Sequence, residues 1–96
     1  MKFYILEYRY ADLERRAEVR PRHLEYLNEL NTQGKLAMAG PLADGTGAIV
    51  VYRAADVAEA QGLVANDPYT AGAVTTDSTL REWNVVITAD PAAPAH

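Results

Sequence analysis

Two residues of this chain have the chemistry of an acid–base pair. His23 lies in the segment RPRHL (20–24) at the head of a strongly helical stretch, and Asp67 lies in NDPY (66–69), where a second helical stretch meets a proline. An imidazole within reach of a carboxylate acts as a base near neutral pH. The only other histidine is the last residue, His96. If the fold joins His23 to Asp67, the chain is equipped to move protons. Otherwise His23 caps a carbonyl or lies at the surface, and Asp67 only helps to end a helix.

Arginines near His23 are candidates for holding an anionic group of a substrate. Arg16 and Arg20 are four residues apart and therefore share a helical face, and Arg20 lies one turn before His23. Two guanidinium groups can clamp a carboxylate or phenolate and acidify an adjacent C–H bond. The competing interpretation is a solvated helix face, because glutamates interleave with the arginines over residues 14–25.

Three further residues are predicted to line a substrate pocket. Tyr69 follows Asp67 closely, whereas Gly40 and Met38 lie on a predicted strand. Tyr69 and Met38 would supply pocket walls, and Gly40 would let a ligand come close to the backbone. Packing in the core or at an interface explains Tyr69 and Met38 equally well, and a glycine at a strand end needs no ligand.

Composition excludes several classes of function. The chain has no cysteine, so it lacks disulfides, thiolate nucleophiles and closed thiolate zinc sites. His23, Asp67 and water would hold a metal only weakly, and we predict no metal and no cofactor. A net charge of −4 disfavours nucleic acid as a partner. The apolar start is too short for a signal sequence and no uncharged run is long enough to span a membrane, so we expect a soluble, cytoplasmic protein without a membrane partner.

Hydrophobic periodicity and turn residues predict six main elements in one domain. In order they are a strand over Phe3–Tyr8, a helix from Asp12 ending at Gly34, strands over Leu36–Pro41 and Thr46–Arg53, a helix from Asp56 to Val64 or Ala65, and a strand over Thr79–Thr88, with a short edge strand over Ala73–Thr76. Pro21 indicates either two successive helices or one kinked helix. The buried face of the long helix is expected to carry Leu13, Ala17, Leu24, Leu27 and Leu30.

This order is the βαββαβ pattern of an α+β, ferredoxin-like fold, in which two helices cover one face of an antiparallel sheet. Several strands are apolar on both faces, so the second face also needs a cover. Packing sheet against sheet in a homodimer provides one. We expect the domain to span residues 1–88 and residues 89–96, rich in alanine and proline, to form a disordered tail.

Five blocks of the chain together resemble the YciI-like (YCII-related) proteins. They are RPRHLEYL (20–27), GKL (34–36), AGPL (39–42), NDPY (66–69) and WN (83–84), and their order and spacing match over roughly residues 2 to 88. The resemblance implies a fold that dimerises into the barrel of the dimeric α+β barrel superfamily. It also implies a pocket with a His–Asp dyad, here His23 and Asp67. The family usually has phenylalanine where this chain has Tyr69, whose hydroxyl changes the polarity of the pocket.

The function that we predict is that of a small dimeric, lyase-like enzyme. The His23–Asp67 pair would transfer a proton during elimination or isomerisation of a small anionic or aromatic-derived metabolite. Two alternatives stay open: a non-catalytic dimer that binds a small ligand or assists an enzyme, and cofactor-free oxygenase or haem-related chemistry in a similar barrel. The residues alone name no substrate.

Overall fold

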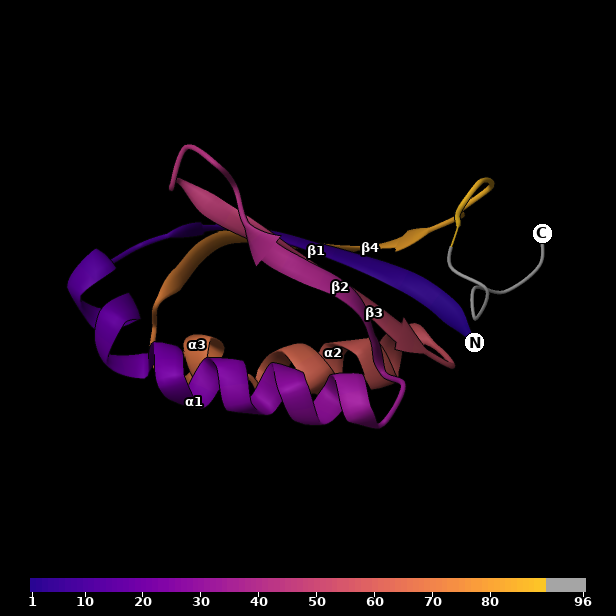
Figure 1. The fold of residues 1–96 in the computed structure, drawn as a ribbon, viewed down its shortest axis with the longest axis horizontal. Helices are drawn as coiled ribbons and strands as arrows, with labels where there is room; N and C mark the ends of the chain where they lie inside the picture. The colour runs from indigo at the N-terminus through magenta and orange to yellow at the C-terminus, as the bar shows by residue number, and fades with distance from the viewer. Residues whose placement is uncertain (90–96) are drawn as a thin grey trace.

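The computed structural model describes residues 1–89, and all but the first residue of the predicted tail therefore lies outside the described part. A four-stranded antiparallel sheet carries all of the described helices on one side (Figure 1). The elements are β1 (Lys2–Tyr10), α1 (Leu13–Thr32), β2 (Leu36–Pro41), β3 (Gly47–Ala54), α2 (Val57–Ala65), α3 (Pro68–Ala71) and β4 (Thr75–Trp83). This is the predicted ferredoxin-like βαββαβ fold, with one short helix added.

The strand order β2-β3-β1-β4 places the two most buried strands, β3 and β1, in the centre. Side chains alternate between the faces of the sheet, and the register sets Leu6 of β1 opposite Val50 of β3. Every second side chain of these two strands points into the core between the sheet and the helices. Its members from β1 and β3 are Tyr4, Leu6, Tyr8, Ala48, Val50, Tyr52 and Ala54.

A single helix, α1, crosses this core, with Pro21 inside it rather than at a break. Asp12 caps its start by accepting a hydrogen bond from the backbone N–H of Arg15 (3.0 Å). As predicted, Gly34 ends it, with φ of +75°, and Lys35 then donates its N–H to the carbonyl of Leu30 (2.9 Å). None of the helices within residues 1–89 combines the length and the hydropathy that a membrane-spanning helix requires.

The buried face of α1 differs from the predicted one. Leu27 and Leu30 are buried as expected, but Leu13 and Leu24 are 62% and 38% exposed, and Ala17 also lies in solvent. The stripe that packs on the sheet consists of Val19, His23, Leu27 and Leu30. Both stripes fit a period of 3.6 residues, so periodicity alone could not distinguish them.

Two helices, α2 and α3, meet at Asp67. Asp56 caps α2 through the N–H of Glu59 (2.9 Å), and α2 ends at Ala65 within the predicted limits. Asp67-Pro68 follows the end of α2, as predicted. Asp67 is also the N-cap of α3, with Pro68 in the first turn, where its fixed φ suits a helix start.

The prediction for the end of the chain was wrong. A short strand over Ala73–Thr76 and a long one over Thr79–Thr88 are replaced by β4, which ends at Trp83. Trp83 pairs with Phe3, and β1 begins at Lys2, so residues beyond Trp83 have almost no strand left to pair with.

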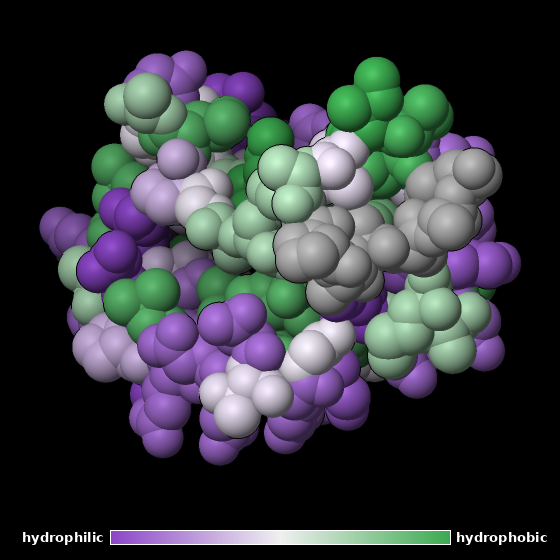
Figure 2. Space-filling view, turned by 45° about the vertical axis from the view of Figure 1, so that its right-hand side comes forward, coloured by the Kyte–Doolittle hydropathy of each residue, from purple (hydrophilic) through white to green (hydrophobic). Residues whose placement is uncertain are grey.

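The sheet face opposite the helices keeps exposed apolar side chains. Met38 is 59% exposed and Trp83 42%. In Figure 2 hydrophilic residues dominate the lower edge, on the side of the helices, and hydrophobic residues gather higher up, at the level of the sheet. Below, this surface is called the open sheet face, meaning the face that carries Ile5, Met38, Gly40, Ile49, Val51 and Trp83.

Candidate active site

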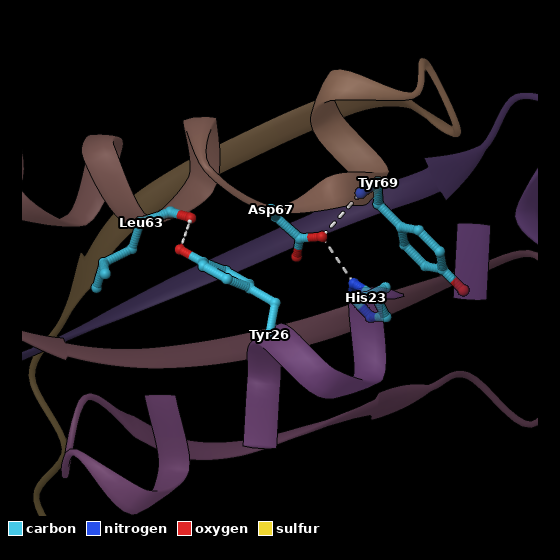
Figure 3. A network of polar contacts seen from close by, with 5 residues as sticks. All are labelled: His23, Tyr26, Leu63, Asp67 and Tyr69. Carbon is cyan, nitrogen blue, oxygen red and sulfur yellow. Dashed lines mark hydrogen bonds and ion pairs between the residues drawn. The ribbon is translucent and has the colours of Figure 1, made fainter. Parts of the chain in front are cut away.

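His23 and Asp67 form a direct contact inside the protein. Nδ1 of His23 lies 2.7 Å from Oδ1 of Asp67, with side chains only 7% and 3% exposed (Figure 3). An ionised carboxylate can only accept, so the ring donates its Nδ1–H. The carboxylate thereby selects the tautomer in which Nε2 is the basic nitrogen. None of residues 1–89 forms a hydrogen bond with Nε2.

Local structure fixes each member of the pair. Asp67 is held as the cap of α3, because its Oδ1 also accepts the backbone N–H of Tyr69 (2.8 Å). His23 lies on the stripe of α1 that faces the core, one turn after Val19 and one before Leu27. The aspartate is therefore anchored by backbone geometry, and the histidine by the packing of its helix.

The ring of Tyr69 covers one face of the imidazole. The two rings are stacked, with parallel planes and centroids 3.6 Å apart, and Figure 3 shows Tyr69 next to His23. Tyr69 is itself 2% exposed. A ring held between a carboxylate and an aromatic face loses its freedom to rotate, as a positioned base requires.

Phenols from β1, α1 and β3 lie near enough to Asp67 for its charge to affect them. Burial raises the pKa of Tyr8, Tyr26 and Tyr52, and the negative charge of Asp67 raises each of them further. Tyr26 donates its O–H to the carbonyl of Leu63 (2.6 Å), which ties α1 to α2 beside the pair. These phenols remain protonated at neutral pH and can therefore act as hydrogen-bond donors.

Arg16 and Arg20, the two predicted substrate-binding arginines, lie near Tyr69. The guanidinium of Arg16 lies over the ring of Tyr10, 4.4 Å from its centroid, and its Nε is buried without a hydrogen-bond partner among residues 1–89. Burial raises the pKa of Tyr69, while the positive charges of Arg16 and Arg20 act against that rise. Arg20 itself is exposed. The structure thus groups Arg16, Arg20 and Tyr69 close to His23.

The other two predicted site residues lie elsewhere in this chain. Met38 pairs with Val51 and Gly40 with Ile49, on the open sheet face. There they border a hollow of about 360 Å³. The thickness of the sheet separates them from His23 and Asp67, whose elements pack on the opposite face.

Sequence reasoning missed Tyr8, Tyr10, Tyr26 and Tyr52. A signal for two of them was present, because Tyr8 and Tyr10 follow Tyr4 and Leu6 with a period of two, which puts them on one face of a strand. Tyr26 follows His23 by three residues, about one helical turn. Tyr52 alone lacked a pattern that would separate it from ordinary core residues.

The arrangement is suited to proton transfer. It provides a base oriented by a carboxylate, phenols that can donate hydrogen bonds, and guanidinium groups for a developing negative charge. Within residues 1–89, no three His, Asp or Glu side chains gather to form a metal-binding cluster.

Comparison with known proteins gives three findings. The model of the YCII-related domain family matches residues 1–84. The uncharacterized protein YjpA of Bacillus subtilis (strain 168) is 33% identical over 63 residues, which cover 66% of this chain and 73% of YjpA. The third is a solved structure of 5-chloro-2-hydroxyhydroquinone dehydrochlorinase (TftG) from Burkholderia phenoliruptrix AC1100 in complex with 2,5-dihydroxybenzoquinone. It superposes with a TM-score of 0.76 and 22% identity, over 85% of this chain and 93% of TftG. TftG thus shares the α+β fold of this chain.

Proposed function

From the premise that this chain belongs to the YCII-related domain family, we propose that it is a small-molecule lyase in which His23 is the general base and Asp67 orients it. The observation that carries the proposal is the buried Nδ1–Oδ1 contact of 2.7 Å. A histidine and a carboxylate in the core of so small a domain are costly to bury. Acid–base chemistry accounts for their presence better than stability does.

The reaction that fits is elimination of a proton and an anionic leaving group. Nε2 of His23 removes a hydroxyl proton from the keto tautomer of a hydroxylated ring, in which the carbon that carries the leaving group is saturated. The electron pair of the O–H bond forms a carbonyl, the adjacent ring double bond shifts toward the saturated carbon, and the leaving group departs with its own electron pair. No oxidant or reductant is needed, because one proton and one anion leave together. Asp67 stabilises the imidazolium that forms.

The substrate class that we propose is a small phenolic or quinol ring. The tyrosine rings around His23 offer flat apolar contact, and Arg16 and Arg20 can hold a phenolate oxygen. TftG is a dehydrochlorinase of a chlorinated hydroquinone and was solved with a quinone bound. Its likeness to this chain supports the choice of the first compounds to assay.

The test is chloride release from 5-chloro-2-hydroxyhydroquinone and related halogenated phenols, with wild type and His23→Ala compared. We expect His23→Ala to lower kcat/KM at least 100-fold, as loss of a general base does. The exposed Arg22→Ala on the same helix should leave it unchanged. His23→Ala with wild-type turnover would reject the mechanism. Binding of 2,5-dihydroxybenzoquinone without any turnover would favour the ligand-binding alternative.

We also propose that two chains pack through their open sheet faces. The exposed side chains of Met38 and Trp83, the hollow between them and the small core of one chain support this proposal. Met38 and Gly40 would then lie in the dimer interface. Light scattering should give twice the chain mass, and Met38→Asp should give the monomer mass. A monomeric wild type at micromolar concentration would contradict the proposal.

A further inference from the structure

One polar group in the core has no use in the proton transfer described above. The hydroxyl of Tyr52 is completely buried, and no residue from 1 to 89 forms a hydrogen bond with it. A buried phenol that loses its hydrogen bond to water destabilises the fold unless something replaces that bond. Phenylalanine would fill nearly the same volume without this cost. The presence of the hydroxyl therefore suggests that it has a hydrogen-bond partner.

A complementary gap exists at Asp67. Its Oδ1 accepts both hydrogen bonds described above, from His23 and from the backbone of Tyr69. In Figure 3 both dashed lines end on this oxygen and neither reaches the second one. Within the described part of the chain, Oδ2 accepts no hydrogen bond. The core therefore holds a fully buried donor without an acceptor, the hydroxyl of Tyr52, and a carboxylate oxygen, Oδ2 of Asp67, that accepts from no described residue and is not fully closed off from solvent.

The two groups belong to the same part of the core. Tyr52 lies opposite Tyr4 in the register of β1 and β3, and both side chains point to the helix side. Helix α2, whose end leads into Asp67, packs on β3. The charge of Asp67 is also close enough to contribute to the raised pKa of Tyr52. A water molecule has the hydrogen-bonding capacity to link the two groups, because it accepts from a phenol and donates to a carboxylate.

We infer that Tyr52 is a positioning residue of the His23–Asp67 pair, and that its phenol acts on Oδ2 of Asp67 through one buried water molecule. The role assigned to Tyr52 rests on the proposed function of the pair. The chain of contacts Tyr52–water–Asp67–His23 would hold the carboxylate plane in line with Nδ1. Tyr26, whose oxygen can still accept a hydrogen bond, is available as a further partner of that water.

The experiment compares Tyr52→Phe with Tyr4→Phe. Tyr4 is the matched control because it is a buried tyrosine directly opposite Tyr52 in the sheet. The readout is the NMR resonance of the Nδ1–H proton of His23, which reports the hydrogen bond to Asp67. We expect Tyr52→Phe to move this resonance and to lower Tm by about 5–10 °C. Tyr4→Phe should leave the resonance in place.

The resonance decides the outcome. If Tyr52→Phe leaves it unmoved, the inference is overturned, whether Tm falls or rises. If Tyr52→Phe does not fold, a high-resolution crystal structure of the wild type replaces it, and a water within about 3.2 Å of both oxygens supports the inference. Lack of such a water overturns it. Neither readout needs turnover, so a moved resonance in a protein that releases no chloride would reject the proposed function alone.

Discussion

Replacing Asp67 by alanine tests whether one carboxylate both caps a helix and holds the histidine. Oδ1 of Asp67 accepts from the Tyr69 N–H at 2.8 Å and from His23 Nδ1 at 2.7 Å. Both bonds are buried. Asp67→Ala removes the one oxygen that accepts both bonds and leaves the imidazole with an unpaired donor in the core.

The expected loss of stability follows from those two bonds. Loss of an N-cap costs about 1 kcal/mol. A buried donor left unsatisfied costs about 1–3 kcal/mol more. Together these give about 2–4 kcal/mol, and at about 4–8 °C per kcal/mol for a domain of this size, Tm should fall by roughly 8–30 °C.

Asp56→Ala separates the two effects. Asp56 also caps a helix, through the Glu59 N–H at 2.9 Å, but it is exposed and has no histidine partner. Its loss should therefore cost only the cap, about 1 kcal/mol. Urea unfolding followed by circular dichroism gives both values. Equal losses for Asp67→Ala and Asp56→Ala would refute the assigned role of the His23 contact, as would a His23→Ala/Asp67→Ala cycle with no coupling energy.

Two more predictions concern the sheet and its tyrosines. Gly47→Ala should destabilise the protein by at least about 2 kcal/mol in urea unfolding, because a Cβ there would overlap the backbone carbonyl of Tyr8. Gly62→Ala, with open space around it in α2, should instead be neutral or stabilising by up to about 1 kcal/mol, and the reverse ranking would contradict this view of β1 and β3. Above pH 10 the unfolded phenols ionise, whereas burial keeps those of Tyr8 and Tyr52 protonated in the fold. The unfolded state then binds fewer protons, so stability should fall by about 1.4 kcal/mol per pH unit for each phenol; urea midpoints from pH 9 to 11.5 measure this, and a flat profile would disprove it.

The element order and the His–Asp contact were both accessible from the sequence, for different reasons. Caps are local, so Asp56 and Gly34 act through neighbouring backbone atoms, which the sequence around them already specifies. The contact between His23 and Asp67 is not local. It was predicted from the family resemblance, which brings together residues that spacing alone left unconnected.

The predictions that were wrong concern residues whose burial depends on contacts with elements distant in the sequence. The face of α1 was assigned to leucines, yet Leu13 and Leu24 are exposed and Val19 and His23 are buried. The true face is the one that meets α3 and the sheet, where His23 finds Asp67. Because His23 is polar, the hydrophobic pattern did not place it on the buried face. Its hydrogen bond to Asp67 compensates for the cost of burying it.

The surroundings of the His23–Asp67 pair also suggest why two polar side chains lie in this core. A buried His–Asp contact stabilises a protein less than well-packed apolar side chains of similar volume would, and this core is small enough for such a loss to matter. The stripe Val19, His23, Leu27 and Leu30 would be complete as a hydrophobic surface if His23 were leucine. Around the pair, however, Tyr69 stacks on the imidazole and Asp67 caps the helix that carries Tyr69. The same few atoms therefore build α3, orient the ring and leave Nε2 free, which is the arrangement expected if local stability is given up for a positioned base.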